Sequence, residues 1–270
     1  WWITNFEMKY QDTFRGLNDY WKKIPEFKNE NIHKPYKINP SSMGGTSVGG
    51  NPVTGYHPYY DEKLCVCFYE YGEQYEFFAN TYFYTGNSGV DLSFKAPDIT
   101  FTNSESLIEY LSSEHFFQLG KLYSNTQSSV NTDDYNQYIE KTKTSLSSPA
   151  TETKSFKFTK KDWDKYKYNV MRFAVWYKFK DDPALKRVLM NTYPKLLIEN
   201  SPKDATWGDN GCDYFCGNGE NNLGIILMEL RDIYMNEAKD AKDAWFSQNF
   251  PKFEIVTISP QYKNFLTHAQ

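Results

Sequence analysis

Ser113-Glu114-His115-Phe116-Phe117-Gln118-Leu119-Gly120-Lys121 is the stretch of this chain that says most about its fold and chemistry. In a helix, at about 100° per residue, Glu114, Gln118 and Lys121 lie on one stripe. Glu114 and Lys121 are two turns apart, about 10 Å at ~1.5 Å per residue, so both long side chains can converge on one small ligand. With Ser113 as the N-cap, Glu114 lies in the first turn, where the helix dipole favours a carboxylate. The alternative is a solvent-facing stripe of an ordinary surface helix.

The composition is that of a folded, aromatic-rich protein whose net charge selects no partner. The 270 residues fit one large domain or one domain with extensions. The 22 Tyr, 20 Phe and 7 Trp residues can build a sizeable core. A net charge of −4 provides no general attraction to nucleic acid, although a local groove or a small polar ligand stays possible.

Nothing in the hydropathy pattern indicates a membrane partner, because no stretch approaches about 18 consecutive apolar residues. The first residues, Trp1-Trp2-Ile3-Thr4, lack the basic and apolar regions of a signal peptide. We therefore expect an intracellular protein, cytoplasmic or nuclear. No motif specifies an oligomeric state.

The four cysteines occur as Cys65-x-Cys67 and Cys212-x-x-x-Cys216. They could form a four-thiolate zinc site, but these spacings differ from those of common zinc knuckles. Cys65 and Cys67 also alternate along an apparent strand and so face opposite sides. Reduced thiols of an intracellular protein are the favoured interpretation, and we expect no metal and no cofactor.

The element pattern predicts an α+β fold: a mainly helical single domain with a small β-sheet. Aromatic and branched residues predict strands at 64–70, 75–84, 99–102 and 196–198. Buried-face spacing and caps predict helices at 10–24, 105–124 with a break near Ser112, 134–143, from the N-cap Thr159 through Tyr177, 183–193 and 223–237. A further helix and a strand at 253–258 are expected in the last thirty residues. Residues 38–58, rich in Gly, Pro and Ser, predict a loop or linker, with a phosphate cradle as the alternative.

Two further clusters place carboxylates, a tryptophan and glycines on tight loops before the helix at 223–237. The first runs from Leu197 to Gly208 and holds Glu199, Asp204 and Trp207. The second, 217–224, leads into the helix N-terminus, whose free N–H groups suit an anion or a polar ligand. Trp207 is either a stacking platform or a hydrophobic plug.

Together these pieces resemble the NADAR family, also called YbiA-like, over about residues 68–234. Five blocks agree in order: 75–80, 113–118 with Lys121, 162–163 with Met171 and Lys178-Phe179, 197–208, and 219–231. The first block departs from the family's Phe-Ser-Asn-Phe pattern at Ala79 and Thr81. The resemblance implies a YbiA-like catalytic domain at 61–238, an N-terminal extension packed on it at 1–60 and a C-terminal extension at 239–270.

What the resemblance implies is an N-glycosidase, a hydrolase that cleaves the bond between a ribose carrying phosphate or ADP and an amine. One branch of the family removes ADP-ribose from the exocyclic amine of guanine in nucleic acid, and another acts on ribose-phosphate intermediates of the riboflavin pathway. The family's acidic residue falls on Glu114, its pocket tryptophan on Trp163, and its second acidic block on Glu199 and Asp204.

Two chemical routes suit the aminal bond at ribose C1. Glu114 could assist proton transfer while an oxocarbenium forms, or a neutral Lys121 could capture the opened ribose as a Schiff base. Lys121 could instead pair with a phosphate or a carboxylate. The expected catalytic residues are Glu114, Lys121 and Asp204; the expected substrate-binding residues are Phe77, Asn80, Gln118, Trp163, Glu199, Trp207, Gly208, Asn221 and Gly224.

Several of these residues keep a structural alternative. Trp163 and Trp207 either wall the ligand pocket or pack in the core, and Asn80 holds either ligand or a loop. Asp204 either serves the ribose hydroxyls or Lys121, or caps a turn after Pro202. We expect Gly208 and Gly224 where backbone approaches closely.

ADP-ribose, or ADP-ribosylated guanine in nucleic acid, is the favoured partner, because lysines recur through 141–167 and aromatic residues precede the matched region. That lysine run is otherwise a solvated helix face. The competing functions are a glycosidase for riboflavin intermediates and a non-catalytic ADP-ribose-binding module.

Overall fold

The computed structural model describes residues 33–38, 55–69, 74–81, 93–97, 107–123 and 163–251. The chain divides into two compact units. We call Trp1–Tyr75 with Met190–Gln270 the loop unit, and Glu76–Leu189 the helix unit. The described residues form long helices and three two-stranded sheets, so the expected mainly helical α+β class is confirmed.

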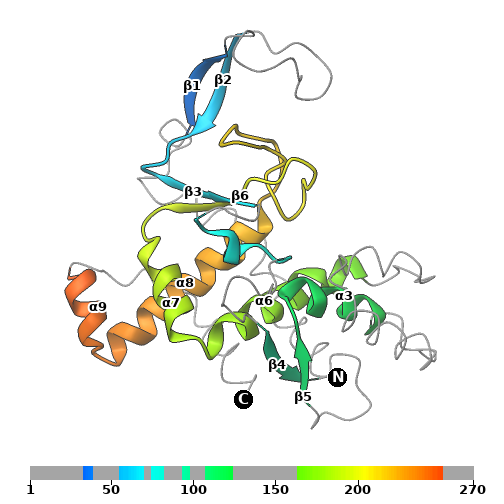
Figure 1. Ribbon diagram of the computed structural model, residues 1–270, viewed down its shortest axis with the longest axis vertical. Coiled ribbons are helices and arrows are strands. Elements are labelled where there is room, and N and C mark those ends of the chain that lie inside the picture. The colour runs from blue at the N-terminus through cyan, green and yellow to red at the C-terminus, as the bar shows by residue number, and fades with distance from the viewer. Residues whose placement is uncertain are drawn as a thin grey trace. The chain divides into compact units, whose positions relative to one another are not determined.

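A buried parallel strand pair forms the centre of the loop unit. β3 (Cys65–Phe68) runs parallel to β6 (Leu196–Glu199), with Cys65 opposite Leu196 and Phe68 opposite Glu199 (Figure 1). Every residue of both strands is buried, as expected for parallel strands covered on both faces. The strands expected at 64–70 and 196–198 are confirmed. The same unit holds an antiparallel pair, β1 (His33–Ile38) with β2 (Gly55–Tyr60).

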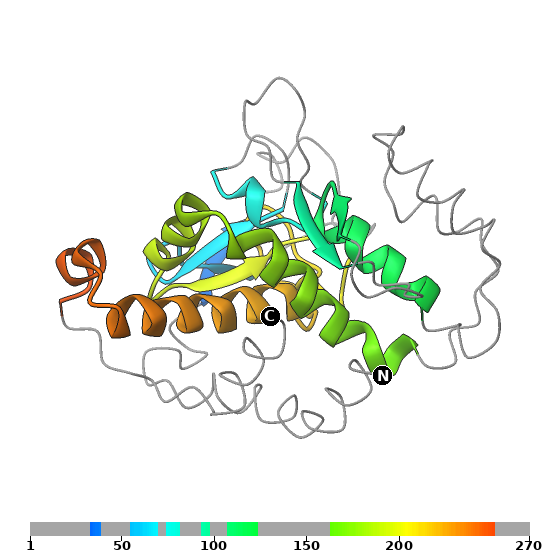
Figure 2. The ribbon, with the colours of Figure 1, turned by 90° about the horizontal axis from the view of Figure 1, so that it is seen from below.

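Helix α8 (Asn222–Asp240) packs against β6 (Figure 2). Most of its apolar side chains are buried, including Leu223, Leu227 and Met235, each with no exposed surface. α8 is followed by the short helix α9 (Ala244–Asn249), capped by Asp243, whose Oδ1 accepts from the Trp245 backbone N–H at 2.8 Å. The expected helix at 223–237 and the helix expected in the last thirty residues are confirmed.

The helix unit is built around a pair of helices. α6 (Trp163–Lys180) packs against α3 (Ser113–Tyr123) and touches β4 (Phe94–Pro97). β4 pairs with β5 (Leu107–Tyr110), and α7 (Pro183–Asn191) begins at the proline expected to start a helix. An aromatic cluster joins these elements through Phe94, Tyr110, Phe116 and Tyr177, with ring centroids 4.9–6.4 Å apart. The predicted buried face of α6 is confirmed for Trp163, Val170, Phe173, Ala174 and Tyr177.

Two predicted elements of this unit are wrong in whole or in part. The strand expected from 75 instead contains the single 3₁₀ turn η3 (Glu76–Phe78), because Phe78 turns inward to stack on Phe179 with centroids 6.2 Å apart. Of the helix expected over 105–124 with a break near Ser112, the part from Ser113 is confirmed, but the part before the break is wrong, since residues 107–110 pair with β4. Aromatic content and apolar spacing do not show which short segments find a strand partner.

The cap of α3 is also one residue earlier than predicted. Ser112 Oγ accepts from the His115 backbone N–H at 3.1 Å, which is the N-cap bond, while the Ser113 side chain is fully buried and bonds elsewhere. Glu114 nevertheless lies in the first turn, as expected.

The loop expected at 38–58 is wrong for its last part, because Gly55 onward belongs to β2, where β1 supplies its hydrogen-bond partners. The remaining predictions lie outside the described residues: helices at 10–24 and 134–143, strands at 99–102 and 253–258, and the cap at Thr159. Among the helices that the structure describes, none is long and apolar enough to cross a membrane.

Candidate active site

Glu114 is placed by the first turn of α3 and by its neighbour one turn along. Its side chain is half-buried, and its Oε1 accepts a hydrogen bond from Nε2 of Gln118, which is 3 % exposed. The predicted stripe therefore brings Glu114 and Gln118 together. Lys121 lies on the same helix, but its side chain is outside the described part of the chain.

Asn80 fixes the start of α3. Its backbone carbonyl accepts from the Glu114 N–H at 3.0 Å, and its Oδ1 accepts from Ser113 Oγ at 3.1 Å. Asn80 is 6 % exposed, so both bonds are shielded from water. Of the two roles left open for this residue, its described contacts are those of a residue that holds a loop and a helix end.

Lys178 is a buried amine that sequence reasoning placed in a family block without a role. It is 5 % exposed, and its Nζ donates to the carbonyl of Ala79 at 2.9 Å. Ala79 precedes Asn80, so α6 supports the segment that positions the Glu114 turn. The signal available in the sequence was a lysine surrounded by apolar residues on a buried helix.

The two predicted aromatic residues of the helix unit lie against other rings. Trp163 opens α6, is 5 % exposed and meets Phe117 edge-on at 4.9 Å. Phe77 is half-buried and meets Phe78 edge-on at 5.0 Å. Trp163 thus packs between helices at the α3–α6 contact.

The predicted acidic block of the loop unit surrounds the carboxyl end of β6. Glu199 ends the strand and is 8 % exposed. Asp204 Oδ1 accepts from the backbone N–H groups of Thr206 and Trp207 at 2.9 and 2.8 Å. That oxygen caps the turn after Pro202, which matches the structural alternative for this residue. Trp207 is half-buried on the turn so formed.

Close backbone approach explains the glycines of this block. A Cβ on Gly208 would lie 2.7 Å from the Glu199 carbonyl, and one on Gly224 would lie 2.1 Å from the Leu197 carbonyl. Contacts this short are not available to a larger residue, so the expectation for both glycines is confirmed.

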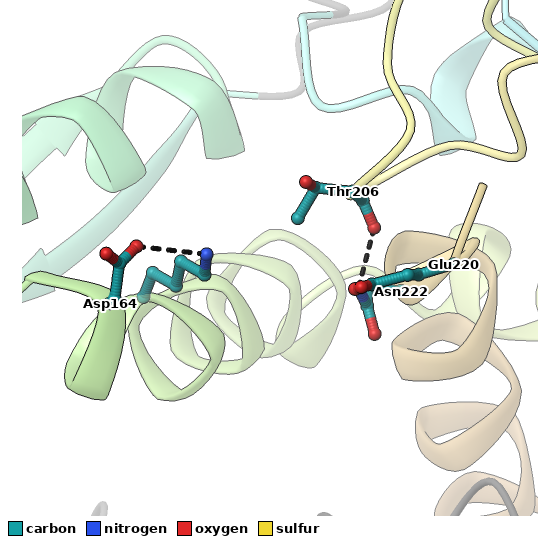
Figure 3. Close-up of polar contacts among 5 residues, drawn as sticks. Asp164, Thr206, Glu220 and Asn222 are labelled. Carbon is teal, nitrogen blue, oxygen red and sulfur yellow. Dashed lines mark hydrogen bonds and ion pairs between the residues drawn. The ribbon is translucent and has the colours of Figure 1, made fainter.

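Asn221 links the start of α8 to β6. It occupies the N-cap in a left-handed conformation, φ 53°, without a side-chain cap bond. Its side chain instead accepts from the Glu199 N–H and donates to the Leu197 carbonyl, both at 2.9 Å. Asn222 Nδ2 donates to the Thr206 carbonyl at 2.6 Å, so the Trp207 turn is joined to the same helix end (Figure 3).

A buried polar pair that the sequence analysis missed organises the loop beneath these residues. Asn200 and Asp209 are 5 % and 2 % exposed, and Asn200 Nδ2 donates to both carboxylate oxygens at 3.1 and 3.2 Å. Asp209 also accepts from the N–H groups of Gly211 and Gly217 at 3.0 and 3.2 Å. The sequence signal was an Asn and an Asp each directly following a predicted site residue.

Two thiols around this loop, Cys65 and Cys216, have strongly raised pKa values. Burial, then the charges of Cys216 and Asp61, raises the pKa of Cys65 from 9.0 to about 12. Burial and Asp209 raise the pKa of Cys216 to about 12. Cys65, Cys67, Cys212 and Cys216 form no disulfide bonds. Among the residues that the structure describes, no group of three His, Cys, Asp or Glu side chains is arranged to hold a metal ion.

The chain is similar to a known domain family and to known proteins. The sequence model of the NADAR domain family matches residues 67–234, one residue more than the resemblance predicted. N-glycosidase YbiA of Escherichia coli (strain K12) is 33 % identical over 120 residues, which cover 44 % of this chain and 68 % of that protein. The riboflavin biosynthesis protein PYRR, chloroplastic, of Arabidopsis thaliana is 42 % identical over 77 residues, 28 % of this chain and 12 % of that protein.

The solved NMR structure of E. coli YbiA aligns with 68 % of this chain and 91 % of its own, with a TM-score of 0.45 and 25 % sequence identity. The family match covers more than half of the chain and includes both the Glu114 helix and the Glu199–Gly224 loops. The chain therefore belongs to the NADAR family, together with the YbiA N-glycosidases.

Proposed function

We propose that this chain is an N-glycosidase that hydrolyses the bond between ribose C1 of ADP-ribose and the exocyclic amine of guanine in nucleic acid. The observation that carries the proposal is the half-buried Glu114 carboxyl in the first turn of α3, bonded to the buried Gln118 amide. An ADP-ribose-binding module needs no such proton-transfer group, whereas cleavage of an aminal does.

Glu114 serves as the general acid and base of the proposed reaction. As the C–N bond breaks, it delivers a proton to the departing guanine amine, and it then takes a proton from the attacking water. Asn80 and Gln118 orient the helix turn and the carboxylate. In the loop unit, Glu199, Trp207 and the start of α8 stay predicted substrate-binding residues, since a helix N-terminus offers free N–H groups to a polar ligand.

The experiment is to incubate the chain with an ADP-ribosylated guanine oligonucleotide and to follow release of ADP-ribose. Glu114→Gln keeps an oxygen that can accept from Gln118, so it should fold normally and lose about 100-fold or more in turnover. Glu109→Gln is the matched control, because Glu109 is an exposed acid of the same unit that bonds Ser93 Oγ. Equal turnover of Glu114→Gln and the unaltered chain would remove Glu114 from the mechanism.

Lys121 as Schiff-base nucleophile is the second part of the proposal. Capture of ribose C1 by a neutral amine would leave an imine that borohydride reduces to a stable adduct. Mass spectrometry should then find the ribose adduct on Lys121. Turnover without any trapped lysine would favour the oxocarbenium route.

A second candidate function is hydrolysis of ribose-phosphate intermediates of riboflavin synthesis. It is favoured by the 42 % identity to the protein named as riboflavin biosynthesis protein PYRR. The same assay with a ribose-phosphate pyrimidine amine distinguishes the two candidates by which amine is released. Binding of ADP-ribose with release of neither amine would indicate the non-catalytic module.

A further inference from the structure

A pocket of about 320 Å³ opens in the loop unit at a place where none of the predicted site residues lies. It is lined by the carboxyl end of β3 with Tyr69, by Asn200 and Pro202 after β6, and by the turn 212–214. Parallel strands commonly bind ligands beyond their carboxyl ends, and this volume is within the range of small-molecule sites. One of the lining residues, Asn200, directly follows Glu199, so the pocket adjoins the acidic block.

The wall formed by the turn 212–214 is rigidly built. Asp213 and Tyr214 both have left-handed backbone conformations, with φ 49° and 66°. Tyr214 N–H donates to Asn200 Oδ1 at 2.8 Å, and the Tyr214 carbonyl accepts from the Tyr60 N–H at 2.7 Å. The buried Asn200–Asp209 pair therefore fixes this wall before any ligand arrives.

The lining chemistry selects against an anion. Asp213, Tyr69 and Tyr214 line the pocket, and among the lining residues that the structure describes there is no lysine or arginine. Burial, Asp213 and Asp209 together raise the pKa of the Cys212 thiol, so the field at this wall is negative. A pyrophosphate would be repelled here, whereas a neutral planar ring with N–H donors would be attracted.

Guanine is a planar ring of this kind. Its N1–H and exocyclic amine are adjacent donors on the Watson–Crick edge, which matches a carboxylate acceptor, and its faces stack on tyrosine rings. Adenine presents an acceptor at N1 and would meet Asp213 unfavourably. We propose that this pocket of the loop unit binds guanine, with Asp213 accepting from its Watson–Crick edge and Tyr69 and Tyr214 flanking the ring; the identity of the base rests on the proposed function.

The test measures guanosine binding to the full chain by isothermal titration calorimetry, with adenosine as the competing probe. Asp213→Asn removes the charge and turns one acceptor into a donor, and Asn tolerates the left-handed conformation at least as well as Asp. We expect guanosine affinity to fall at least about tenfold in this variant. Asp240→Asn is the matched control, an exposed acid at the far end of α8. Unchanged guanosine affinity in Asp213→Asn, absence of guanosine binding, or equal affinity for adenosine would overturn the proposal.

A second measurement needs no variant. Cys212 lines the pocket, whereas Cys216 of the same loop does not. Guanosine should slow alkylation of Cys212 at pH 9 and leave Cys216 unaffected, as read by mass spectrometry of each peptide. Equal protection of both thiols, or of neither, would contradict occupancy of this pocket.

These outcomes separate the pocket from the reaction. If the oligonucleotide is hydrolysed equally by Asp213→Asn and guanosine does not bind, the glycosidase proposal stands and the guanine pocket fails. If guanosine binds through Asp213 but the oligonucleotide is not cleaved, the pocket stands and the reaction fails.

Discussion

The loop unit and the helix unit hold their candidate residues by different forces. In the loop unit, Asn200 and Asp209 share a buried hydrogen-bond network, and glycines let backbone segments touch. In the helix unit, ring packing along α3 and α6 predominates, with the buried Lys178 amine as one fixed polar contact. A buried polar network fails as a whole when one member is removed, whereas apolar packing accommodates small changes. The loop unit should therefore be the more sensitive of the two.

The largest effect is expected for Asp209→Ala. The change removes the carboxylate, itself 2 % exposed, that accepts from the N–H groups of Gly211 and Gly217 and from Asn200 Nδ2, which keeps its bond to the Phe215 carbonyl. At about 1–3 kcal/mol for each buried unsatisfied group, the free energy of unfolding should fall by about 3 kcal/mol or more. Urea unfolding measures this, with the exposed Asp240→Ala as control. A loss below about 1 kcal/mol would mean that water replaces the carboxylate and that the network is not decisive.

Gly224→Ala tests the close approach of α8 to β6. Helix propensity alone would make the variant more stable by about 1 kcal/mol. The added Cβ, 2.1 Å from the Leu197 carbonyl, should instead push the helix off the strand and lower the unfolding free energy by about 2 kcal/mol. Thermal unfolding gives the sign. A stabilised variant would show that α8 shifts freely and that the loop unit is less rigid than we infer.

Lys178→Met is the corresponding test in the helix unit. It removes the donor to the Ala79 carbonyl but retains the apolar stem, so we expect a loss of about 1–2 kcal/mol in unfolding free energy. The Asn80 carbonyl, next to Ala79, accepts from the Glu114 N–H, so the change should also displace Glu114 and lower glycosidase turnover. The control is Lys167→Met on the same helix, where the partly exposed Lys167 pairs at 3.1 Å with Asp164, which is labelled in Figure 3. That pair should contribute less than about 0.5 kcal/mol, and a larger loss there than at Lys178 would reverse the interpretation.

The last effect is absent at neutral pH and appears only in alkaline solution. The folded Cys65 thiol has a pKa of about 12 against an ordinary value of 9.0, so the native state keeps a proton that the unfolded chain releases. The stability from this neutral thiol is fully present below pH 9 and is lost as the pH rises toward 12. The slope reaches at most about 1.4 kcal/mol per pH unit. Cys65→Ala should flatten the alkaline limb of a stability–pH curve, and an unchanged slope would assign that limb to other groups.

The sequence by itself determined the helices whose apolar faces are long. α6 and α8 repeat buried positions over many turns. The start of α7 at Pro183 follows from the local sequence and does not depend on contacts with other segments. It also determined the family, because five blocks in fixed order are specific even when each is weak. The Glu114–Gln118 pairing followed from helix spacing alone.

Only the tertiary structure decided the short elements and the buried Asn200–Asp209 network. Residues 107–110 form a strand because β4 pairs with them, and Phe78 sits in a 3₁₀ turn because Phe179 provides a buried surface. Asn200 and Asp209 gain their importance from backbone groups up to fifteen residues away along the chain. Local propensity reports contacts within a few residues. A partner that folding brings from elsewhere in the chain leaves no local signal, so the network and the pocket wall that it fixes could be found only in three dimensions.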